Sequence, residues 1–376
     1  MARNGIPIHS EKLTIARELR GLSISDLAKK IEKTRQLISM IENGAAMPSH
    51  EVLQLIASKL DFPIRFFTKE QVSTETLNST VFFRSMKGAL ASQRQKSKRW
   101  LQLIIQQYAF YDKDVEFPDV ELYRYEGNYE ELTNQDIEEM AKEARKLWGL
   151  ADGPISNLTL LLENHGIIVS HMDLAVSELD ACSTTWGGRP FMLINTTKST
   201  CSRVLSNTAH ELGHLILHGG VDRTDLENKE KHDLLEKQAW SFAAYFLMPS
   251  SSFFAELHTI NLTAFVSLKS RWRTSIASMI MRCAEEGIID EFRKTYLFRE
   301  MSRNGYRRKE PFDDTLPIEK PHLLFDADKA LVEGNVFSKE ELLDRVALES
   351  GDYCVMIGAD SDYMQSECKK PVLYVI

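Results

Sequence analysis

The sequence predicts an α+β protein that is mostly helical and divided into several domains. Its 376 residues correspond to two or three domains at a prior of roughly 150 residues each. Apolar residues recur at helical spacing over most of the chain, whereas only 167–169 and 191–194 are short apolar runs bounded by turn residues. We therefore expect many helices around one small sheet.

Charge is distributed unevenly along the chain. The formal net charge is -8, yet residues 1–70 carry eleven Lys or Arg against eight Asp or Glu. The stretch from Arg84 to Arg99 adds six basic residues and no acidic one. A basic N-terminal third in an acidic protein is typical of a nucleic-acid-binding module. The alternative is a solvated, basic helix face.

Cysteine usage and hydropathy favour a reduced, cytoplasmic protein. The five cysteines form no Cys-x-x-Cys pair, so neither a disulfide framework nor a thiolate zinc site is indicated. The first residues, MARNGIPIHS, do not resemble a signal peptide. No apolar run approaches the ~20 residues that span a bilayer, so we expect no membrane association.

Residues 11–67 predict a domain of five short helices. The signals are clearest for 13–22, 25–31 and 34–42, where apolar residues recur every three or four positions. An Asn-Gly pair ends the third of these helices, and Pro48-Ser49 begins another that runs to about residue 60.

Longer helices follow. A helix over 80–111 begins basic and becomes apolar and aromatic, and the acidic, Tyr-rich stretch 112–132 is expected to be a linker. Further helices are expected over 133–149, 158–164, 203–218 and 231–248, the last ended by Pro249.

The C-terminal part combines helices with a linker. Two more amphipathic helices are expected within 264–298, and the proline-rich, charged stretch 302–321 is expected to connect them to the tail. In the tail, Ser338 and Glu341 form a capping-box pattern that begins a helix. The chain ends in the strand-like run PVLYVI, so we expect a small mixed C-terminal domain.

The run HELGH predicts a metal site. His210 and His214 are four residues apart on an expected helix, so they lie about 40° apart and both side chains can reach one ion. Glu211 lies beside them, where its carboxylate can accept a proton from water and pass it to a leaving amine. The alternative is a pair of core histidines with no metal.

The metal requires a third protein ligand, and three positions in the sequence come into consideration. His218 continues the i, i+4 series but lies about 80° from His210 around the helix, so it is better suited to support the site. The metzincin position, six residues after His214, is Gly220 and is excluded. Glu236 shares an otherwise apolar helix face, where zinc would compensate its charge. A salt bridge between Glu236 and a buried Arg is the alternative.

Residues 133–290 resemble the ImmA/IrrE metallopeptidases of bacteria and their mobile elements. The resemblance follows five ordered blocks: GPISNLTLLLENHGIIV, ELDACSTTW, PFMLINTTKST, the HELGH helix ending in LILH, and EKQAWSFAAYFLMP. It implies one zinc ion per chain bound by His210, His214 and Glu236, with Glu211 as the catalytic base. It also implies a zincin-like domain, and a substrate that is a helix-turn-helix repressor cleaved after stress or DNA damage.

The segment SISDLAKKIEKTRQLISMIENGAAMPSHEVLQLIASKL resembles XRE-type helix-turn-helix domains. In such domains the second helix of the motif enters the major groove of double-stranded DNA. The candidate DNA contacts are then Thr34, Arg35, Gln36 and Ser39, since these residue types suit base edges or phosphates. A helical domain used only for protein contacts is the alternative.

These resemblances divide the chain into four parts. They are a helix-turn-helix domain over 1–70, a connector helix and linker over 71–130, a peptidase domain over 131–300, and a linker with a small C-terminal domain over 301–376. The predicted function is a DNA-binding regulator that cleaves a partner repressor or itself. A regulator with a structural or sensory metal site, and a toxin–antitoxin component, are the alternatives. The oligomeric state stays open, although repressors of this type are commonly homodimers.

Overall fold

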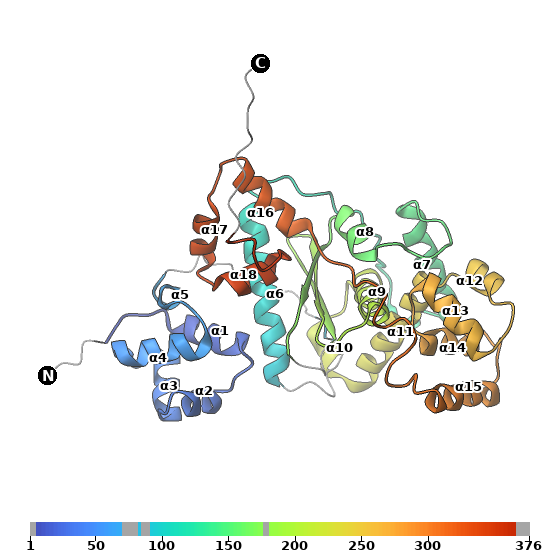
Figure 1. Ribbon diagram of the computed structural model, residues 1–376, viewed down its shortest axis with the longest axis horizontal. Coiled ribbons are helices and arrows are strands. Elements are labelled where there is room, and N and C mark those ends of the chain that lie inside the picture. Colours follow the sequence, from blue (N-terminus) through green and yellow to red (C-terminus); the bar gives the residue numbers. More distant parts are fainter. Residues whose placement is uncertain (1–4, 70–81, 84–90, 176–179, 366–376) are drawn as a thin grey trace, which may run out of the picture.

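The computed structural model describes residues 5–69, 82–83, 91–175 and 180–365. Within these residues the chain is mostly helical and contains one four-stranded sheet, which confirms the predicted α+β class. An N-terminal bundle, a central region around the sheet and a group of helices after α11 are distinct in Figure 1. Among the described helices, none combines the length and the apolar character that a membrane span requires.

The N-terminal bundle contains the five helices expected from the sequence. Polar caps set three helix starts, because the side chains of Ser23, Thr34 and Ser49 each accept a backbone N–H of the turn that follows. Arg17 donates to Glu42 at 2.6 Å and ties the first helix to the third. The helices are α1 (Ser10–Leu19), α2 (Ile24–Lys30), α3 (Arg35–Glu42), α4 (His50–Leu60) and α5 (Ile64–Thr68).

The sheet has the strand order β1-β3-β4-β2. Strands β2 (Ile168–Met172) and β4 (Arg189–Asn195) are parallel and extend the two predicted runs, while β3 (Ala181–Trp186) is antiparallel to β4. Strand β3 was not predicted, because ACSTTW lacks an apolar run. The overlooked signal is the Gly187-Gly188 pair, which has positive φ at both residues and connects β3 to β4 as a tight hairpin turn.

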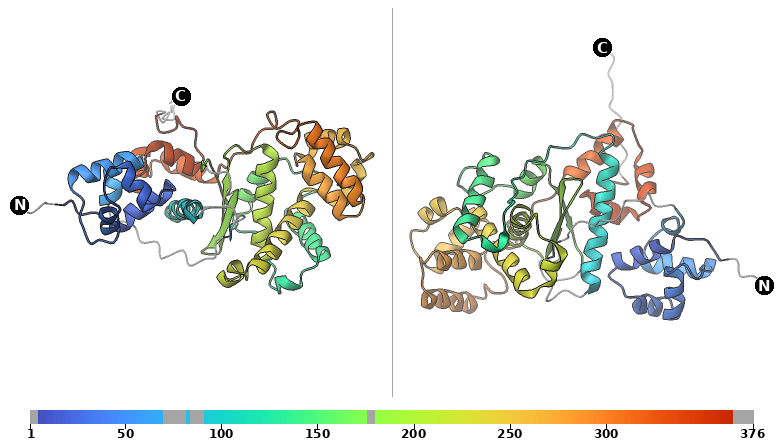
Figure 2. Two further views of the ribbon diagram at one scale, coloured as in Figure 1. Left: turned by 90° about the horizontal axis from the view of Figure 1, so that it is seen from below. Right: turned by 180° about the vertical axis from the view of Figure 1, so that it is seen from behind.

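Two cores cover the two faces of the sheet. One face, with Ile168 and Phe191, packs against α6 (Ala91–Tyr111) and the C-terminal helices. The opposite face, with Met192 and Ile194, packs against the helices that carry HELGH and Glu236. Figure 2 shows α6 between the N-terminal bundle and the sheet.

The connector helix begins later than predicted. Residues 82–83 are not helical but form β1 (Phe82–Phe83), which pairs with β3, as aromatic residues readily do in strands. Arg84 and Lys87, part of the predicted basic helix, lie outside the described residues. The central helices match the predicted ranges closely: α7 (Asn134–Leu147), α8 (Leu158–Asn164), α9 (Cys201–Leu217) and α11 (Lys229–Leu247), with the short η1 (Tyr129–Glu131) and α10 (Arg223–Glu227) between them.

The region after α11 is more helical than predicted. Two helices were expected within 264–298, and the structure has these and two more, one on either side. They are α12 (Ser250–Glu256), α13 (Leu262–Trp272), α14 (Ile276–Glu285) and α15 (Glu291–Arg303).

The described C-terminal residues form three helices that pack on α6. Buried Asp328 accepts hydrogen bonds from the hydroxyls of Tyr111, Tyr353 and Tyr363, which ties this group to the connector helix. The predicted capping box is present, and the strand predicted at PVLYVI lies outside the described residues. The helices are α16 (Leu323–Glu333), α17 (Lys339–Val346) and α18 (Ser350–Ile357).

Candidate metal centre

Helix α9 presents both histidines of HELGH toward α11. The helix begins at its N-cap Thr200, and both His210 and His214 are almost completely buried. The helices approach closely at Gly213, where an added Cβ would lie 3.0 Å from Ala239 O of α11. This close approach brings the α11 carboxylate of Glu236 within reach of both imidazoles.

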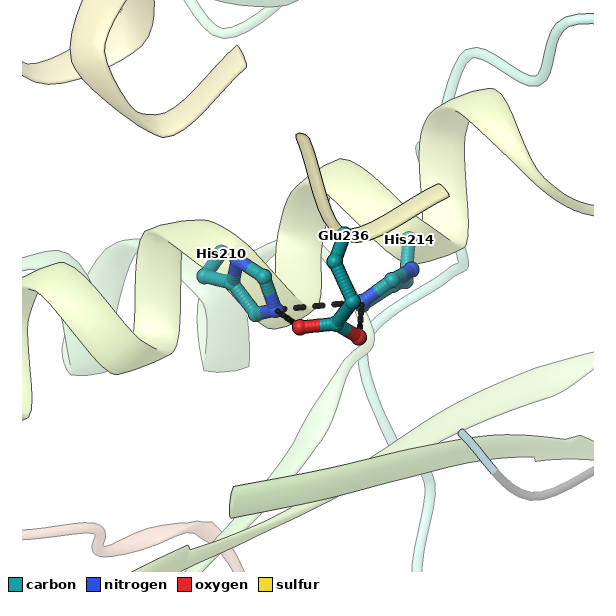
Figure 3. A group of neighbouring side chains, drawn as sticks. All are labelled: His210, His214 and Glu236. Carbon is teal, nitrogen blue, oxygen red and sulfur yellow. Dashed lines mark hydrogen bonds and ion pairs between the residues drawn. The ribbon is translucent and has the colours of Figure 1, made fainter. Parts of the chain in front are cut away.

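The three predicted ligands converge on one point (Figure 3). His210 Nε2 and His214 Nε2 are 3.1 Å apart. Glu236 Oε2 lies 3.5 Å from His210 Nε2, and Glu236 Oε1 lies 3.4 Å from His214 Nε2. The Glu236 side chain is 19% exposed, so the group is open to one side.

A relay of hydrogen bonds fixes the tautomer of His214. Gln238 Nε2 donates to Tyr129 O at 2.7 Å, which turns Gln238 Oε1 toward His218 Nε2 at 3.0 Å. His218 therefore donates through Nε2 and accepts through Nδ1, which lies 3.0 Å from His214 Nδ1. His214 must then donate through Nδ1, and its Nε2 lone pair faces His210 and Glu236. The structure thus gives His218 the supporting place that its helical spacing suggested.

This arrangement fits a zinc ion. Burial lowers the pKa of His214 to about 3, so the imidazole is in the neutral form that binds metal. Donor atoms around a tetrahedral zinc at ~2.0 Å lie about 3.3 Å from one another, close to the observed 3.1–3.5 Å separations. Two imidazoles and one carboxylate leave a fourth position for water or substrate, as in catalytic zinc sites. Gly220 is exposed beyond the end of α9 and is no part of the group.

Glu211 is held by Ser183, a residue with no predicted role. Its side chain is buried, and Ser183 Oγ donates to Glu211 Oε2 at 2.6 Å. Ser183 lies on β3, so the strand that was not predicted supplies the contact that orients the candidate base. Trp240 of α11 was also not assigned a role, and its ring lies 4.3 Å from that of His210.

The candidate DNA-contacting residues gather at one end of α3. Thr34, Arg35 and Gln36 are exposed, and Ser39 is half-buried one turn further on. Thr34 Oγ1 also accepts from Leu37 N at 3.2 Å as the helix cap. The first turn of α3 therefore presents its polar side chains to solvent, the orientation that a recognition helix requires.

Two family models match the chain. One, described as helix-turn-helix, matches residues 13–67, and the other, a peptidase model described as the IrrE N-terminal-like domain, matches residues 162–284. The chain is a fusion of these two modules. The first match ends within α5, and the second includes both histidines of HELGH, Glu211 and Glu236. This confirms the resemblance drawn from the sequence, and makes the protein a helix-turn-helix protein with a peptidase-type domain. A search of curated proteins found no match.

Proposed function

We propose that this protein is a DNA-binding regulator whose zinc-dependent endopeptidase domain cleaves a partner helix-turn-helix repressor, or its own chain, to switch gene expression in a stress, phage or mobile-element response. The observation that carries the proposal is the convergence of His210, His214 and Glu236 beside a buried, oriented Glu211. A structural zinc site has no use for an oriented carboxylate next to an open coordination position. The activity is therefore expected to be narrow and regulated.

Each residue of the site has its own role in peptide hydrolysis. A zinc ion bound by His210, His214 and Glu236 would supply a Lewis acid that polarises water and the scissile carbonyl. Glu211 accepts the proton of the attacking water and delivers it to the leaving amine. Ser183 holds Glu211 Oε2 in place for both transfers.

The helix-turn-helix module is proposed to bring the peptidase to its site of action. Arg35 and Gln36 extend from the exposed first turn of α3, where they can read guanine and adenine edges in the major groove of double-stranded DNA. Replacing both with alanine is expected to abolish a mobility shift on the promoter of the protein's own gene. A shift of unchanged strength would refute this placement of the recognition helix.

Cleavage in trans is tested with any helix-turn-helix repressor that is encoded beside the gene. Wild type and Glu211→Gln are each co-expressed with that repressor, and its fragments are identified by mass spectrometry under DNA-damaging conditions. We expect one cut with wild type and none with Glu211→Gln. An intact repressor in both cultures would remove the support for cleavage in trans.

One observation favours cleavage within the chain as a second candidate. Strand β1 pairs antiparallel with β3, and Phe82 lies opposite Ser183. The connector backbone therefore lies at the sheet edge that holds the candidate base, as a peptide bound by strand addition would. Self-cleavage predicts an N-terminal fragment of about 70–120 residues from wild type and not from Glu211→Gln. A full-length chain under the same inducing conditions would contradict it.

A further inference from the structure

A polar cleft opens beside the metal centre. It has a volume of about 390 Å³, a size typical of small ligand sites, and lies between the first half of α9, the helices α13 and α14, and the segment after α15. Its lining is dominated by basic and hydroxyl side chains. The basic residues are Lys198, Arg203, Lys269, Arg307, Arg308 and Lys309.

Six basic residues and two acidic residues line the cleft, so its lining is positively charged. Both acids are paired with Lys269, whose Nζ lies 2.7 Å from Glu310 Oε2 and 2.6 Å from Asp313 Oδ1. The exposed side chains of Lys198 and Arg308 have no acidic partner within 4.0 Å among the described residues. Two cations at the cleft are therefore available to an anionic ligand.

A buried hydroxyl in the wall also points to a ligand. Ser202, in the first turn of α9, is 3% exposed and lines the cleft. Its Oγ has no hydrogen-bond partner among the residues that the structure describes. A buried hydroxyl without a partner is costly in a folded protein, and a ligand in the cleft would satisfy it.

The cleft adjoins the metal centre through Trp240. Arg203, Asn207 and His210 follow one another at spacings of four and three on α9, so they share one face of the helix. Trp240 belongs both to the cleft and to the surroundings of His210. Seven helical residues rise about 10 Å, and an extended peptide covers that distance in about three residues. A substrate segment bound beside Arg203 is then about three residues from the cleaved bond, and one that reaches Lys198, before the start of α9, is further from it.

One carboxylate of the chain itself, that of Glu310, is already bound at the side of the cleft formed by α13 and α14. Glu310 accepts hydrogen bonds from the backbone N–H groups of Ile276 and Ala277 at the start of α14, in addition to its pair with Lys269. This side of the cleft therefore binds a carboxylate that belongs to a polypeptide. A peptide ligand is favoured over nucleic acid, because the cleft shares its aromatic wall with a site built for peptide hydrolysis.

We propose that this cleft binds an acidic segment of the cleaved protein, with Lys198 and Arg308 contacting its carboxylates and Ser202 donating to it. The inference rests on the proposed peptidase function and names its substrate class: a protein with glutamate or aspartate three or more residues from the cleaved bond. An acidic preference of this kind makes the peptidase selective without any contact at the metal.

The test measures binding by the full-length Glu211→Gln chain loaded with zinc, which cannot cleave its ligand. A fluorescein-labelled peptide of about ten residues, alternating alanine with glutamate, is compared by fluorescence anisotropy with its glutamine counterpart. We expect the glutamate peptide to bind about tenfold more tightly. Adding Lys198→Glu and Arg308→Glu to this chain should abolish the preference for the glutamate peptide. Arg299 is an exposed cation of α15 outside the cleft, so Arg299→Glu is the control and should preserve the preference.

Ser202→Ala provides a variant that should fold normally, because its hydroxyl bonds to no described residue. We expect it to weaken binding of the glutamate peptide about three- to tenfold with an unchanged melting temperature. Equal binding of the two peptides, or a preference that survives the double reversal, would overturn the proposal. So would a single-stranded oligonucleotide that binds through Lys198 and Arg308 and is not displaced by the acidic peptide.

These outcomes are separable from those of the proposed function. Binding to Glu211→Gln does not depend on catalysis, so loss of the acidic preference with repressor cleavage intact would refute only the cleft proposal. Acidic-peptide binding without cleavage by wild type would refute only the catalytic proposal.

Discussion

Replacing Ser183 by alanine removes the hydroxyl that donates to Glu211 Oε2 at 2.6 Å. Both residues are 0% exposed, so water does not readily replace the lost donor. A hydrogen bond to a charged group is worth about 1.5–3 kcal/mol. If that stabilisation is needed when Glu211 accepts and returns the proton, kcat/KM falls roughly 10- to 150-fold.

The assay is single-turnover cleavage of the repressor identified by co-expression, with zinc content measured in parallel. Ser183→Ala should keep its zinc, because Ser183 contacts the base and none of the proposed ligands. The fall should appear in the rate of the chemical step and leave substrate binding unchanged.

Ser170 provides the matched control. It is a buried serine of β2, pairs with Leu193 of β4, and its hydroxyl bonds to no described residue. Ser170→Ala should cleave at the wild-type rate. If Ser183→Ala cleaves as fast as Ser170→Ala at equal zinc content, the hydrogen bond to Glu211 does not matter and the reasoning fails.

Two further substitutions test other parts of the structure. Gly213→Ala would place a methyl group 3.0 Å from Ala239 O, so α11 must shift. We expect equilibrium dialysis to show a zinc affinity lowered roughly tenfold. An unchanged zinc affinity would mean that the helices tolerate the methyl group. Burial raises the pKa of Glu163 to about 7, although it accepts from His322 N. The native state then holds a proton that the unfolded state has lost, so this residue's contribution to stability falls by about 3 kcal/mol as pH rises from 4.5 to 7. Urea unfolding of Glu163→Gln should lack that decline, and parallel pH curves for both proteins would contradict it.

Local spacing explains what could be predicted of the site. His210, Glu211 and His214 are close because they lie on one helix, and any helical assignment brings them together. Glu236 could be selected because it is a carboxylate on an otherwise apolar helix face. The position of α11 against α9, on which the whole group depends, was not derivable from the sequence. Gly213 permits this close approach, since a Cβ there would lie 3.0 Å from Ala239 O, but the glycine alone does not specify which helix packs against it.

Contacts between distant segments explain what was missed. Strand β3 is stabilised by pairing with β4 rather than by an apolar pattern of its own, so its local signal was limited to the Gly187-Gly188 turn. The Ser183 contact with Glu211 was not visible in the sequence. Lys198 and Arg308 are 110 positions apart in the numbering and meet at one cleft only after folding. Conversely, the helix predicted over 80–111 is wrong at Phe82 and Phe83, because these two residues pair with β3.

Zinc content is the measurement that tests the central claim most directly. Wild type, Glu211→Gln and Glu236→Gln are purified, dialysed against a weak chelator and analysed by mass spectrometry for metal per chain. The proposed site predicts one zinc ion in wild type and in Glu211→Gln, and a large loss in Glu236→Gln. Wild type without zinc, or Glu236→Gln that keeps its zinc as firmly as wild type, would contradict the assignment of the metal centre.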